Sequence, residues 1–277
     1  MFPTLLIALQ QQTVTYVERM PYTSNELLYR NLLFTATGLI LIIGLLLVNR
    51  MRVIKKKQRS VEIEKEKYKT LLYGILPEKI AEEFIETGHV EARRHEQVSV
   101  MFTDFAGFTQ YAESIKPMEL VGDLDAVFSM FDSIIQKRKV EKIKTIGDSY
   151  MCCAGLPEDS PTHAEDLLDV ALDFLEFIQI FRNMKAAEGK NFPDIRIGMH
   201  CGPVVASIIG VSKSAYDIWG DTVNLAQRME LASESGKINI TEPMYQLVKD
   251  TFICIPRGLQ EAKGKGNIPM YFVEGRK

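Results

Sequence analysis

Residues 98–109 read VSVMFTDFAGFT, a strand signal that runs straight into a turn. The run Val98–Thr103 is rich in Val, Phe and Thr and predicts a β-strand that ends at Asp104. The small residues that follow predict a turn into a helix, and the free N–H groups at such a helix start can hold a phosphate. We therefore mark this turn as a candidate substrate contact, through Phe105, Gly107, Phe108 and Thr109.

Strand and helix signals alternate after this stretch. A helix is predicted over residues 117–135, because its apolar residues keep helical spacing behind an initial proline. Two strand-like runs, Lys142–Ile146 and Ser149–Ala154, are joined by Gly147-Asp148, a dipeptide typical of tight hairpins. The pattern therefore predicts a β-hairpin with an aspartate in its turn.

The rest of the chain continues the alternation. A second amphipathic helix is predicted over residues 167–181, and a strand over residues 195–201 is followed by another apolar run, 204–209. Asp221 can cap a helix of about three turns. Short strands are predicted near residues 238–240, 252–255 and 270–273. Strand, helix, hairpin, helix, strand is the order of a split βαβ fold, so we predict an α+β, ferredoxin-like domain over residues 95–277.

Composition excludes several classes of protein. The 277 residues are 46% hydrophobic and 25% charged, which is typical of a globular rather than a disordered chain. The 33 Lys and Arg residues are matched by 36 Asp and Glu residues, so no nucleic-acid partner is expected. The four cysteines form no CxxC pair, which favours reduced thiols in a cytosolic domain over a secreted disulfide framework.

One segment is apolar throughout. Residues 32–48 read LLFTATGLILIIGLLLV without a charge, and Asn31 and Asn49 extend the segment to nineteen residues. At about 1.5 Å per residue, a helix of this length matches a hydrocarbon core of about 30 Å. A buried core helix is the alternative, but such helices usually carry a polar stripe. We therefore predict a single transmembrane helix over residues 31–49.

Charges on either side of this segment predict its orientation. Six basic residues follow it within residues 50–59, whereas the two basic residues before it are offset by two glutamates. The positive-inside rule then places the C-terminal part in the cytoplasm and residues 1–30 outside, in the cell (inner) membrane. A cleaved signal peptide is the weaker alternative, because residues 1–30 lack a basic start. A start that is truncated from something longer also stays open.

Residues 50–94 are predicted to form a helical linker to the C-terminal domain. Four apolar residues recur at every seventh position: Ile54, Val61, Tyr68 and Ile75. This is the spacing of a coiled-coil seam, although charged residues between them make the heptad partial. We favour a short parallel dimer seam over the alternative of a solvated single helix. A second helix is predicted over residues 78–86, between Pro77 and Gly88.

Two carboxylates stand out in the predicted sheet. Asp104 ends the first strand, and Asp148 lies in the hairpin beside it. Paired carboxylates at neighbouring strand ends suit Mg2+, and two such ions can hold both the attacking and the leaving oxygen at a phosphorus centre. Taken singly, Asp104 could be a helix N-cap and Asp148 an ordinary turn residue, and the spacing alone leaves these alternatives open.

Four motifs resemble, in order, those of the class III nucleotidyl cyclases, the adenylyl and guanylyl cyclase family. They are VSVMFTDFAGFT (98–109), KIKTIGDSYM (142–151), YDIWGDTVNLAQRM (216–229) and KGKGNIPMYFV (263–273). The resemblance covers about residues 95–275, and LLYGILPEKIAEEF (71–84) is similar to the segment that precedes the catalytic domain in membrane-bound members. It implies a membrane-anchored adenylate cyclase that converts ATP to 3′,5′-cyclic AMP and pyrophosphate.

The resemblance also implies roles for individual residues in a head-to-tail dimer. Asp104 and Asp148, assisted by the Phe105 carbonyl, would hold two Mg2+ or Mn2+ ions that activate the ribose 3′-OH for in-line attack on the α-phosphate. Lys144 and Asp217 of the other subunit would read adenine, as a donor to N1 and an acceptor from the 6-amino group. Guanine presents the reverse pattern, so ATP is the expected substrate.

Further residues complete the implied site. Asn224 and Arg228 resemble the pair that orients the ribose and neutralises charge on the transferring phosphoryl group, and their i, i+4 spacing puts them on one helix face. Lys263, more than its neighbour Lys265, is similar to the lysine that holds the terminal phosphates. The chain departs from the family at Pro203, where some members carry an arginine as an extra phosphate contact.

Because one chain carries both the metal-binding and the base-reading residues, a homodimer with two equivalent sites is the expected assembly. Two alternatives remain. The first is a guanylate cyclase, whose members typically carry Glu and a Cys-like residue in place of Lys144 and Asp217. The second is a catalytically silent, membrane-anchored dimerisation or receptor module, which the intact set of metal-binding and transition-state residues disfavours.

Overall fold

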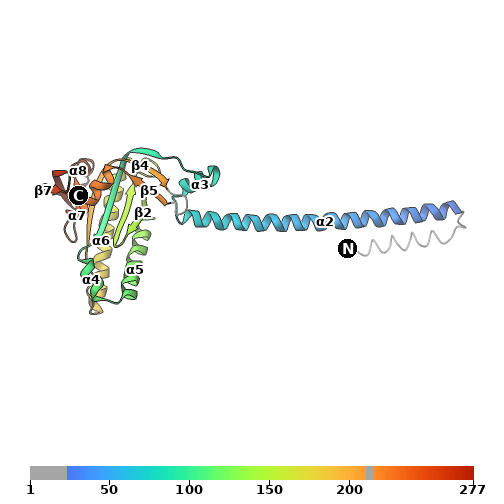
Figure 1. Cartoon of the computed structure of the whole chain (residues 1–277), viewed down its shortest axis with the longest axis horizontal. Coiled ribbons are helices and arrows are strands. Elements are labelled where there is room, and N and C mark those ends of the chain that lie inside the picture. Colours follow the sequence, from blue (N-terminus) through green and yellow to red (C-terminus); the bar gives the residue numbers. More distant parts are fainter. Residues whose placement is uncertain (1–23, 210–214) are drawn as a thin grey trace. The chain divides into compact units, whose positions relative to one another are not determined.

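The computed structural model describes residues 24–209 and 215–277 (Figure 1). The chain divides into two units, residues 1–69 and residues 70–277, and the second contains the whole mixed fold. Most of the predicted extracytoplasmic segment, residues 1–30, lies outside the described residues.

Helix α2, Ser24–Tyr73, contains both the predicted apolar segment and the first part of the predicted linker. The large apolar side chains between residues 32 and 48 are exposed along it. By length and composition this helix is the one candidate membrane span in the part of the chain that the structure describes. Among the described residues, none covers this apolar surface as neighbours would cover a core helix.

The helix ends before the last position of the predicted heptad. Ile75 lies in a turn rather than in α2, because Pro77 has no N–H to donate and disfavours helical geometry at the residue before it. A second helix, α3 (Glu78–Thr87), follows this turn and ends at Gly88 with a φ of 76°. The seam predicted from Ile54 to Ile75 can therefore extend only to Tyr68 in helical register.

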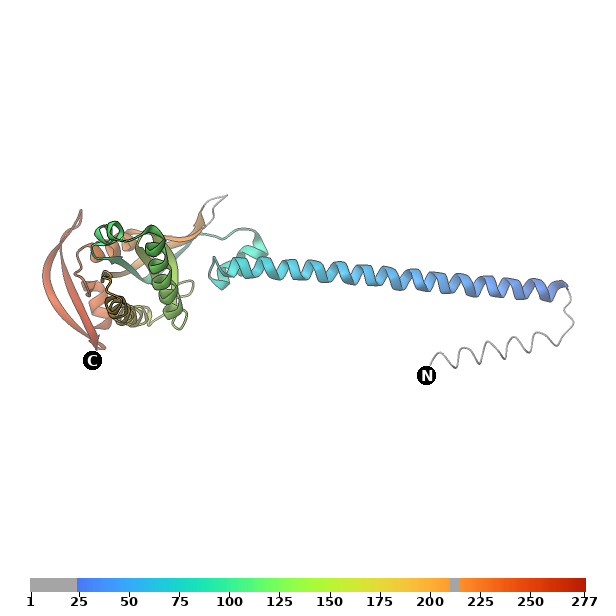
Figure 2. The same cartoon turned by 90° about the horizontal axis from the view of Figure 1, so that it is seen from below.

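Within the described residues, eight strands form one open sheet in the order β2-β3-β1-β4-β6-β8-β7, with β5 paired to β4. The strands are β1 (Arg93–Phe105), β2 (Val140–Ile146), β3 (Ser149–Ala154), β4 (Ile195–Ile209), β5 (Ala215–Trp219), β6 (Ile238–Thr241), β7 (Phe252–Ala262) and β8 (Gly266–Arg276). All pairs are antiparallel except β4 with β6. The β7–β8 hairpin forms one end of the sheet, and β2 forms the other (Figure 2). The predicted mixed α+β fold is confirmed.

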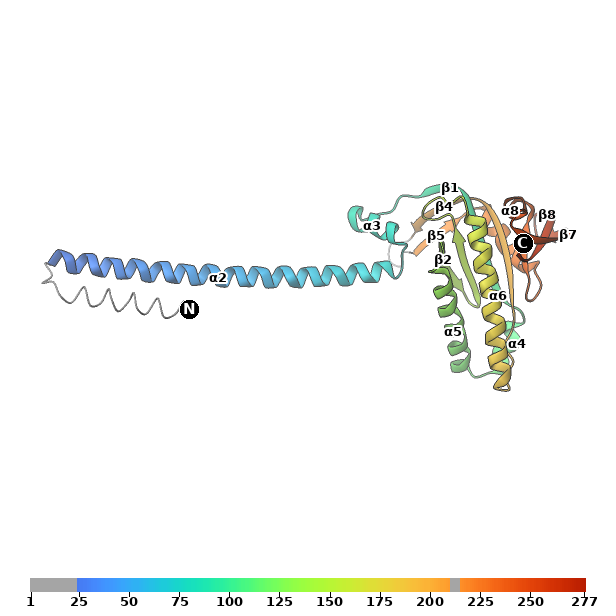
Figure 3. The same ribbon diagram turned by 180° about the vertical axis from the view of Figure 1, so that it is seen from behind.

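Two long helices, α5 (Pro117–Ile135) and α6 (His163–Ala187), pack side by side on one face of the sheet (Figure 3). Their contact centres on Phe131 and Phe174, whose rings stack with centroids 3.7 Å apart. Shorter helices fill the remaining connections: α4 (Phe108–Ser114), α7 (Asp221–Leu231) and α8 (Glu242–Val248). Both long helices lie where helical spacing predicts them.

Successive side chains of β1 point to opposite faces of the sheet and pack into two separate hydrophobic cores. Met101 and Phe105 point into the core under α5 and α6, whereas Val100 and Phe102 point into a core on the opposite face. The opposite core also receives apolar side chains from the end of α2, from the turn and from α3: Leu72, Leu76, Ile80 and Ala81. The segment that precedes β1 is thus packed into the same unit as the sheet.

The structure extends one predicted element and corrects the cap of another. The runs 195–201 and 204–209 form one strand, β4, because the irregular pairing of β1 between His95 and Val98 lies opposite Pro203 and accommodates its missing N–H. Helix α7 is capped by Gly220 rather than by Asp221, since only glycine readily adopts its φ of 149°.

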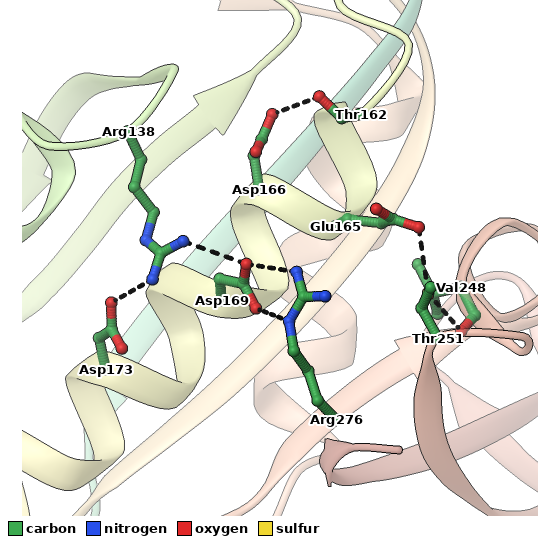
Figure 4. A network of polar contacts seen from close by, with 9 residues as sticks. All are labelled: Arg138, Thr162, Glu165, Asp166, Asp169, Asp173, Val248, Thr251 and Arg276. Carbon is green, nitrogen blue, oxygen red and sulfur yellow. Dashed lines mark hydrogen bonds and ion pairs between the residues drawn. The ribbon is translucent and has the colours of Figure 1, made fainter.

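A charged network on α6 links the segment before β2 to the end of β8 (Figure 4). Asp169 accepts hydrogen bonds from Arg138, which precedes β2, and from Arg276, which ends β8. Arg138 also donates to Asp173, one helical turn further along α6. These contacts tie the end of β8 to the helix layer.

Candidate active site

Asp104, the next-to-last residue of β1, is held by a neighbour on each side. The hydroxyl of Ser149, which opens β3, donates to Oδ1 at 2.9 Å. The Nη2 of Arg196, which lies opposite Asp104 on β4, donates to Oδ2 at 2.7 Å. Because both flanking strands contribute, the sheet itself fixes the orientation of this carboxylate. Asp104 is not a helix N-cap, since Gly107 occupies that position of α4.

The structure brings Asp148 to the same place. Its side chain, in the β2–β3 turn, interacts with the carboxylate of Asp104 and with the backbone of Phe105. Burial raises the pKa of Asp148, and the nearby charge of Asp104 raises it further. The three residues predicted to bind metal are therefore together, and the mutual repulsion of the two carboxylates is what a bound cation would relieve.

The candidate metal ligands are few, and all of them are oxygen atoms. No cluster of three or more His, Cys, Asp or Glu side chains suited to a metal ion occurs among residues 24–209 and 215–277. A pair of carboxylates with a backbone carbonyl leaves coordination positions for water and phosphate oxygens, which is the pattern that Mg2+ prefers. These residues fit a divalent cation shared with a nucleotide better than a closed structural metal site.

Two residues that the sequence reasoning missed complete this group. Arg196 also forms an ion pair with Glu230 of α7 at 3.1 Å, and Glu230 is 3% exposed. Burial raises the pKa of Glu230 to about 7, Arg196 lowers it, and the two aspartates raise it. The one available signal was a charged residue at each of two otherwise apolar positions, Arg196 between Ile195 and Ile197 and Glu230 after Met229.

Helix α7 reaches this group because it lies directly on β4. A Cβ atom at Gly198 would overlap the backbone of Met229 and Glu230. Gly202 similarly leaves room for the Thr222 side chain, whose hydroxyl donates to the Pro203 carbonyl at 2.7 Å. The glycines of β4 therefore set the close approach that carries Glu230 to Arg196.

Lys144 and Asp217 form a second group. Lys144 lies on β2 and Asp217 on β5, and their side chains form an ion pair within one chain. The Asp217 carboxylate also accepts a hydrogen bond from the Ile218 amide at 2.9 Å. Both side chains are partly exposed, so a donor and an acceptor stand together at the surface, as expected from the sequence.

The phosphate-binding candidates lie around α7. Asn224 is exposed on this helix, and Arg228 one turn later lies under the β7–β8 turn, 3.6 Å from where a Gly264 side chain would begin. The Nη1 atom of Arg228 is buried and has no hydrogen-bond partner among the described residues. Lys263 is exposed in that turn, whereas Lys265 forms an ion pair with Asp221 at 2.7 Å. Of the two lysines, Lys263 is the one left open to a ligand in the described part of the chain.

The turn after Asp104 is placed as predicted. Gly107 caps α4 with a φ of 76°, and Phe108 and Thr109 open the helix. The Ala106 amide is already used, since it donates to the Asp194 carbonyl at 2.8 Å. The amides from Gly107 onward are the ones that a phosphate could reach.

The predicted residues therefore form three groups: the carboxylates at the β1 end, the Lys144–Asp217 pair, and the α7 face with the β7–β8 turn. Among the described residues no hydrogen bond or ion pair joins the Asp104 group to the Lys144 pair, or either of them to Arg228.

The chain is similar to known nucleotide cyclases. Residues 90–275 match the family described as the adenylate and guanylate cyclase catalytic domain. An adenylate cyclase of Mycobacterium tuberculosis is 37% identical over 228 residues, which cover 82% of this chain and 51% of that protein. The chain thus spans about half the length of the curated relatives it matches first.

Solved structures give the same result. A guanylate cyclase domain from Catenaria anguillulae, solved in complex with GTP, is 37% identical with a TM-score of 0.63, over 67% of this chain and 100% of that one. An adenylyl cyclase from P. aeruginosa is 27% identical with a TM-score of 0.65, over 68% of this chain and 98% of that one. The family match alone covers more than half of the chain. The chain belongs to the adenylate and guanylate cyclase catalytic-domain family, the class III nucleotidyl cyclases that its motifs resemble.

Proposed function

We propose that the chain is an adenylate cyclase that converts ATP to 3′,5′-cyclic AMP and pyrophosphate. The observation that carries the choice of nucleotide is the pairing of Lys144 with Asp217. An ammonium group can donate to adenine N1, and a carboxylate beside it can accept from the 6-amino group. Guanine offers a protonated N1 and a 6-oxo acceptor, so the same two side chains would meet it with the wrong polarity.

Asp104, Asp148 and the Phe105 carbonyl are proposed to hold two divalent cations, Mg2+ or Mn2+. Members of this family generally use divalent metal ions. When bound, such ions supply Lewis-acid activation of the ribose 3′-OH and neutralise charge at the α-phosphate. The protein keeps Asp104 in one orientation through Ser149 and Arg196, so the carboxylate is ordered before the nucleotide arrives.

Helix geometry supports a site shared between two chains. Residues two apart on an α-helix are rotated by about 200°, because one residue turns about 100°. Glu230 points to Arg196 of its own chain, so Arg228 points to nearly the opposite side of α7. Asn224 shares the face of Arg228. We therefore assign Asn224 and Arg228 to the cations of a partner chain, in a head-to-tail homodimer with two equivalent sites.

The roles of these side chains follow from their charges. Arg228 neutralises charge on the transferring phosphoryl group, which explains why its buried Nη1 has no partner among the described residues. Asn224 orients the ribose, and Lys263 holds the terminal phosphates. The amides at the start of α4, from Gly107 to Thr109, add phosphate contacts beside Asp104.

The N-terminal part is proposed to anchor the enzyme. The apolar segment of α2 would cross a lipid bilayer once, and the basic residues after it would keep the catalytic domain in the cytoplasm. The heptad positions up to Tyr68 would align two chains as a short coiled coil. The strand order β2-β3-β1-β4 with α5 and α6 on one face supports the ferredoxin-like split βαβ assignment for the catalytic domain.

The decisive experiment is to incubate the purified chain with ATP or with GTP in the presence of Mn2+ and to identify the cyclic product. Cyclic AMP from ATP, at a kcat/KM well above that for GTP, is the expected result. Preferential formation of cyclic GMP would make the chain a guanylate cyclase. No cyclic product from either nucleotide in a verified dimer would leave the catalytically silent module as the better description.

A further inference from the structure

Arg196 stands between two carboxylates with different surroundings. Its guanidinium donates to Asp104 at 2.7 Å and pairs with Glu230 at 3.1 Å. Asp104 belongs to the proposed metal-binding group, whereas Glu230 is 3% exposed, lies on α7 and contacts the same Nη2 atom of Arg196. One guanidinium therefore contacts both the partly buried carboxylate of Asp104 and the buried carboxylate of Glu230.

The charges of this cluster can be counted. Asp104, Asp148 and Glu230 contribute three negative charges when ionised, and Arg196 contributes one positive charge. Without Glu230 the guanidinium would cancel half of the charge that Asp104 and Asp148 offer to a divalent cation. With Glu230 present, Arg196 and Glu230 form a neutral pair, and the two aspartates keep their full charge.

We propose that Glu230 sets the affinity of the Asp104–Asp148 group for divalent cations by neutralising Arg196, so that the guanidinium orients Asp104 without cancelling its charge. Glu230 is thus a positioning and charge-balancing residue that acts through Arg196. The inference rests on the metal-binding role proposed above for Asp104 and Asp148.

The packing around Glu230 shows how the pair is kept in place. Gly198 lets the backbone of α7 at Glu230 lie against β4, two residues along from Arg196. Helix α7 cannot withdraw the carboxylate without leaving the sheet. Glu230 is buried and Arg196 is partly buried, so water screens the attraction between the two charges less than it would at the surface. An exposed ion pair would have far less influence on a nearby metal ion.

The test measures Mn2+ binding, without nucleotide, to the whole chain in detergent, from the electron paramagnetic resonance signal of free Mn2+. At pH 8, above the pKa of about 7 for Glu230, the carboxylate is ionised. Glu230→Gln should weaken Mn2+ binding about tenfold, the effect typical of a residue one shell removed from a metal. The double variant R196Q/E230Q, which removes the pair as a neutral unit, should restore most of the wild-type affinity.

A purely structural role for the ion pair predicts a different pattern, in which the double variant binds Mn2+ at least as weakly as E230Q. That outcome, or an E230Q variant with wild-type affinity, would overturn the inference. The double variant leaves no unpaired charge in the core, so it tests the inference even if E230Q does not fold. Thermal unfolding of each variant establishes that the protein is folded.

Two further variants complete the experiment. Glu234→Gln removes a carboxylate that lies just beyond α7 and is 65% exposed, so it should leave Mn2+ affinity unchanged. Asp104→Asn should abolish tight Mn2+ binding. If D104N binds Mn2+ like the wild type, the proposed metal site itself is wrong. If D104N loses binding while E230Q keeps it, only the role of Glu230 is wrong.

Discussion

Lys144 and Asp217 pair with each other within one chain, although 73 residues separate them. Each therefore satisfies its partner before any nucleotide is present. A base that binds here has to replace that contact with two hydrogen bonds of matching polarity, one from the ammonium group and one to the carboxylate. A base of the wrong polarity would leave both groups unpaired, which is the strongest basis that binding sites have for discrimination.

The first prediction concerns this pair. The double variant K144E/D217C should lower kcat/KM for ATP about a hundredfold or more, because its polar groups no longer match adenine. Cyclic AMP and cyclic GMP are measured separately after incubation with each nucleotide. Lys142, two residues earlier on β2, pairs with Asp132 instead, so Lys142→Gln is a matched control that should keep ATP turnover. Unchanged ATP turnover in the double variant would show that these residues do not read the base.

The second prediction tests whether each site is shared. Homodimers of Asp104→Ala and of Arg228→Ala should both be inactive, because every site lacks one essential group. After co-expression, random pairing makes about half of the dimers mixed, and each mixed dimer has one intact site. Cyclic AMP production should therefore return to about a quarter of the wild-type rate if the sites act independently.

Each single variant expressed alone is the control for this experiment, at equal protein amount. Activity in either homodimer would contradict the assigned roles. A purified mixed dimer without activity would mean that the sites do not work independently or that the groups are divided differently between the chains.

The third prediction concerns the contact between α7 and β4. Gly198→Ala should destabilise the catalytic domain by about 1–3 kcal/mol or more, because the added methyl group overlaps the backbone of α7. Gly122, in the middle of α5, has open space around its Cα, so Gly122→Ala should be neutral or stabilise by about 0.5–1 kcal/mol. Denaturant unfolding measures the free energy of unfolding of both variants and of the wild type. Equal values for the two variants would contradict the close approach of α7 to β4.

The fourth prediction concerns pH and His200. Burial lowers the pKa of His200 from 6.5 to about 4, while Asp221 opposes and Lys265 adds to this shift. His200 is 8% exposed, and its Nδ1 atom is hydrogen-bonded to the Thr241 hydroxyl at 2.7 Å. Between pH 6.5 and 4 the unfolded chain binds a proton here that the folded chain does not, so stability falls as the pH falls through this window, by at most about 3 kcal/mol.

His200→Gln removes this titration. Comparing the free energy of unfolding at pH 7 and pH 5 for both proteins isolates the contribution of the histidine from that of the acidic residues. The variant should lose less stability than the wild type between these two values. An identical loss in both would show that His200 is protonated equally in the folded and unfolded chains.

Much of the fold follows from local patterns. Helical spacing located α5 and α6, and the Gly147-Asp148 hairpin located β2 and β3, because these elements bury one face each. The shorter elements α8 and β5 were not predicted, since five to seven residues carry too little periodicity. The end of α2 was misplaced because the heptad pattern continued past the helix-breaking effect of Pro77.

The candidate site, like the fold, was predicted only in part. Asp104 and Asp148 were predicted to be neighbours, because the end of a strand lies beside the turn of an adjacent hairpin in the same sheet. Arg196 and Glu230 were not, since their meeting depends on how closely α7 approaches β4. That distance is set by the missing side chain of Gly198, a tertiary effect that no spacing along the chain reveals.

The seating of α7 on β4 also limits how the enzyme can open and close. A helix whose backbone rests against a glycine of the sheet cannot swing as a lid, and its ion pair to Arg196 opposes sliding along its axis. We therefore expect Asn224 and Arg228 to move together with β4. In the proposed dimer, closure around ATP would then come from rotation of whole subunits about their interface, with the hinge outside the sheet.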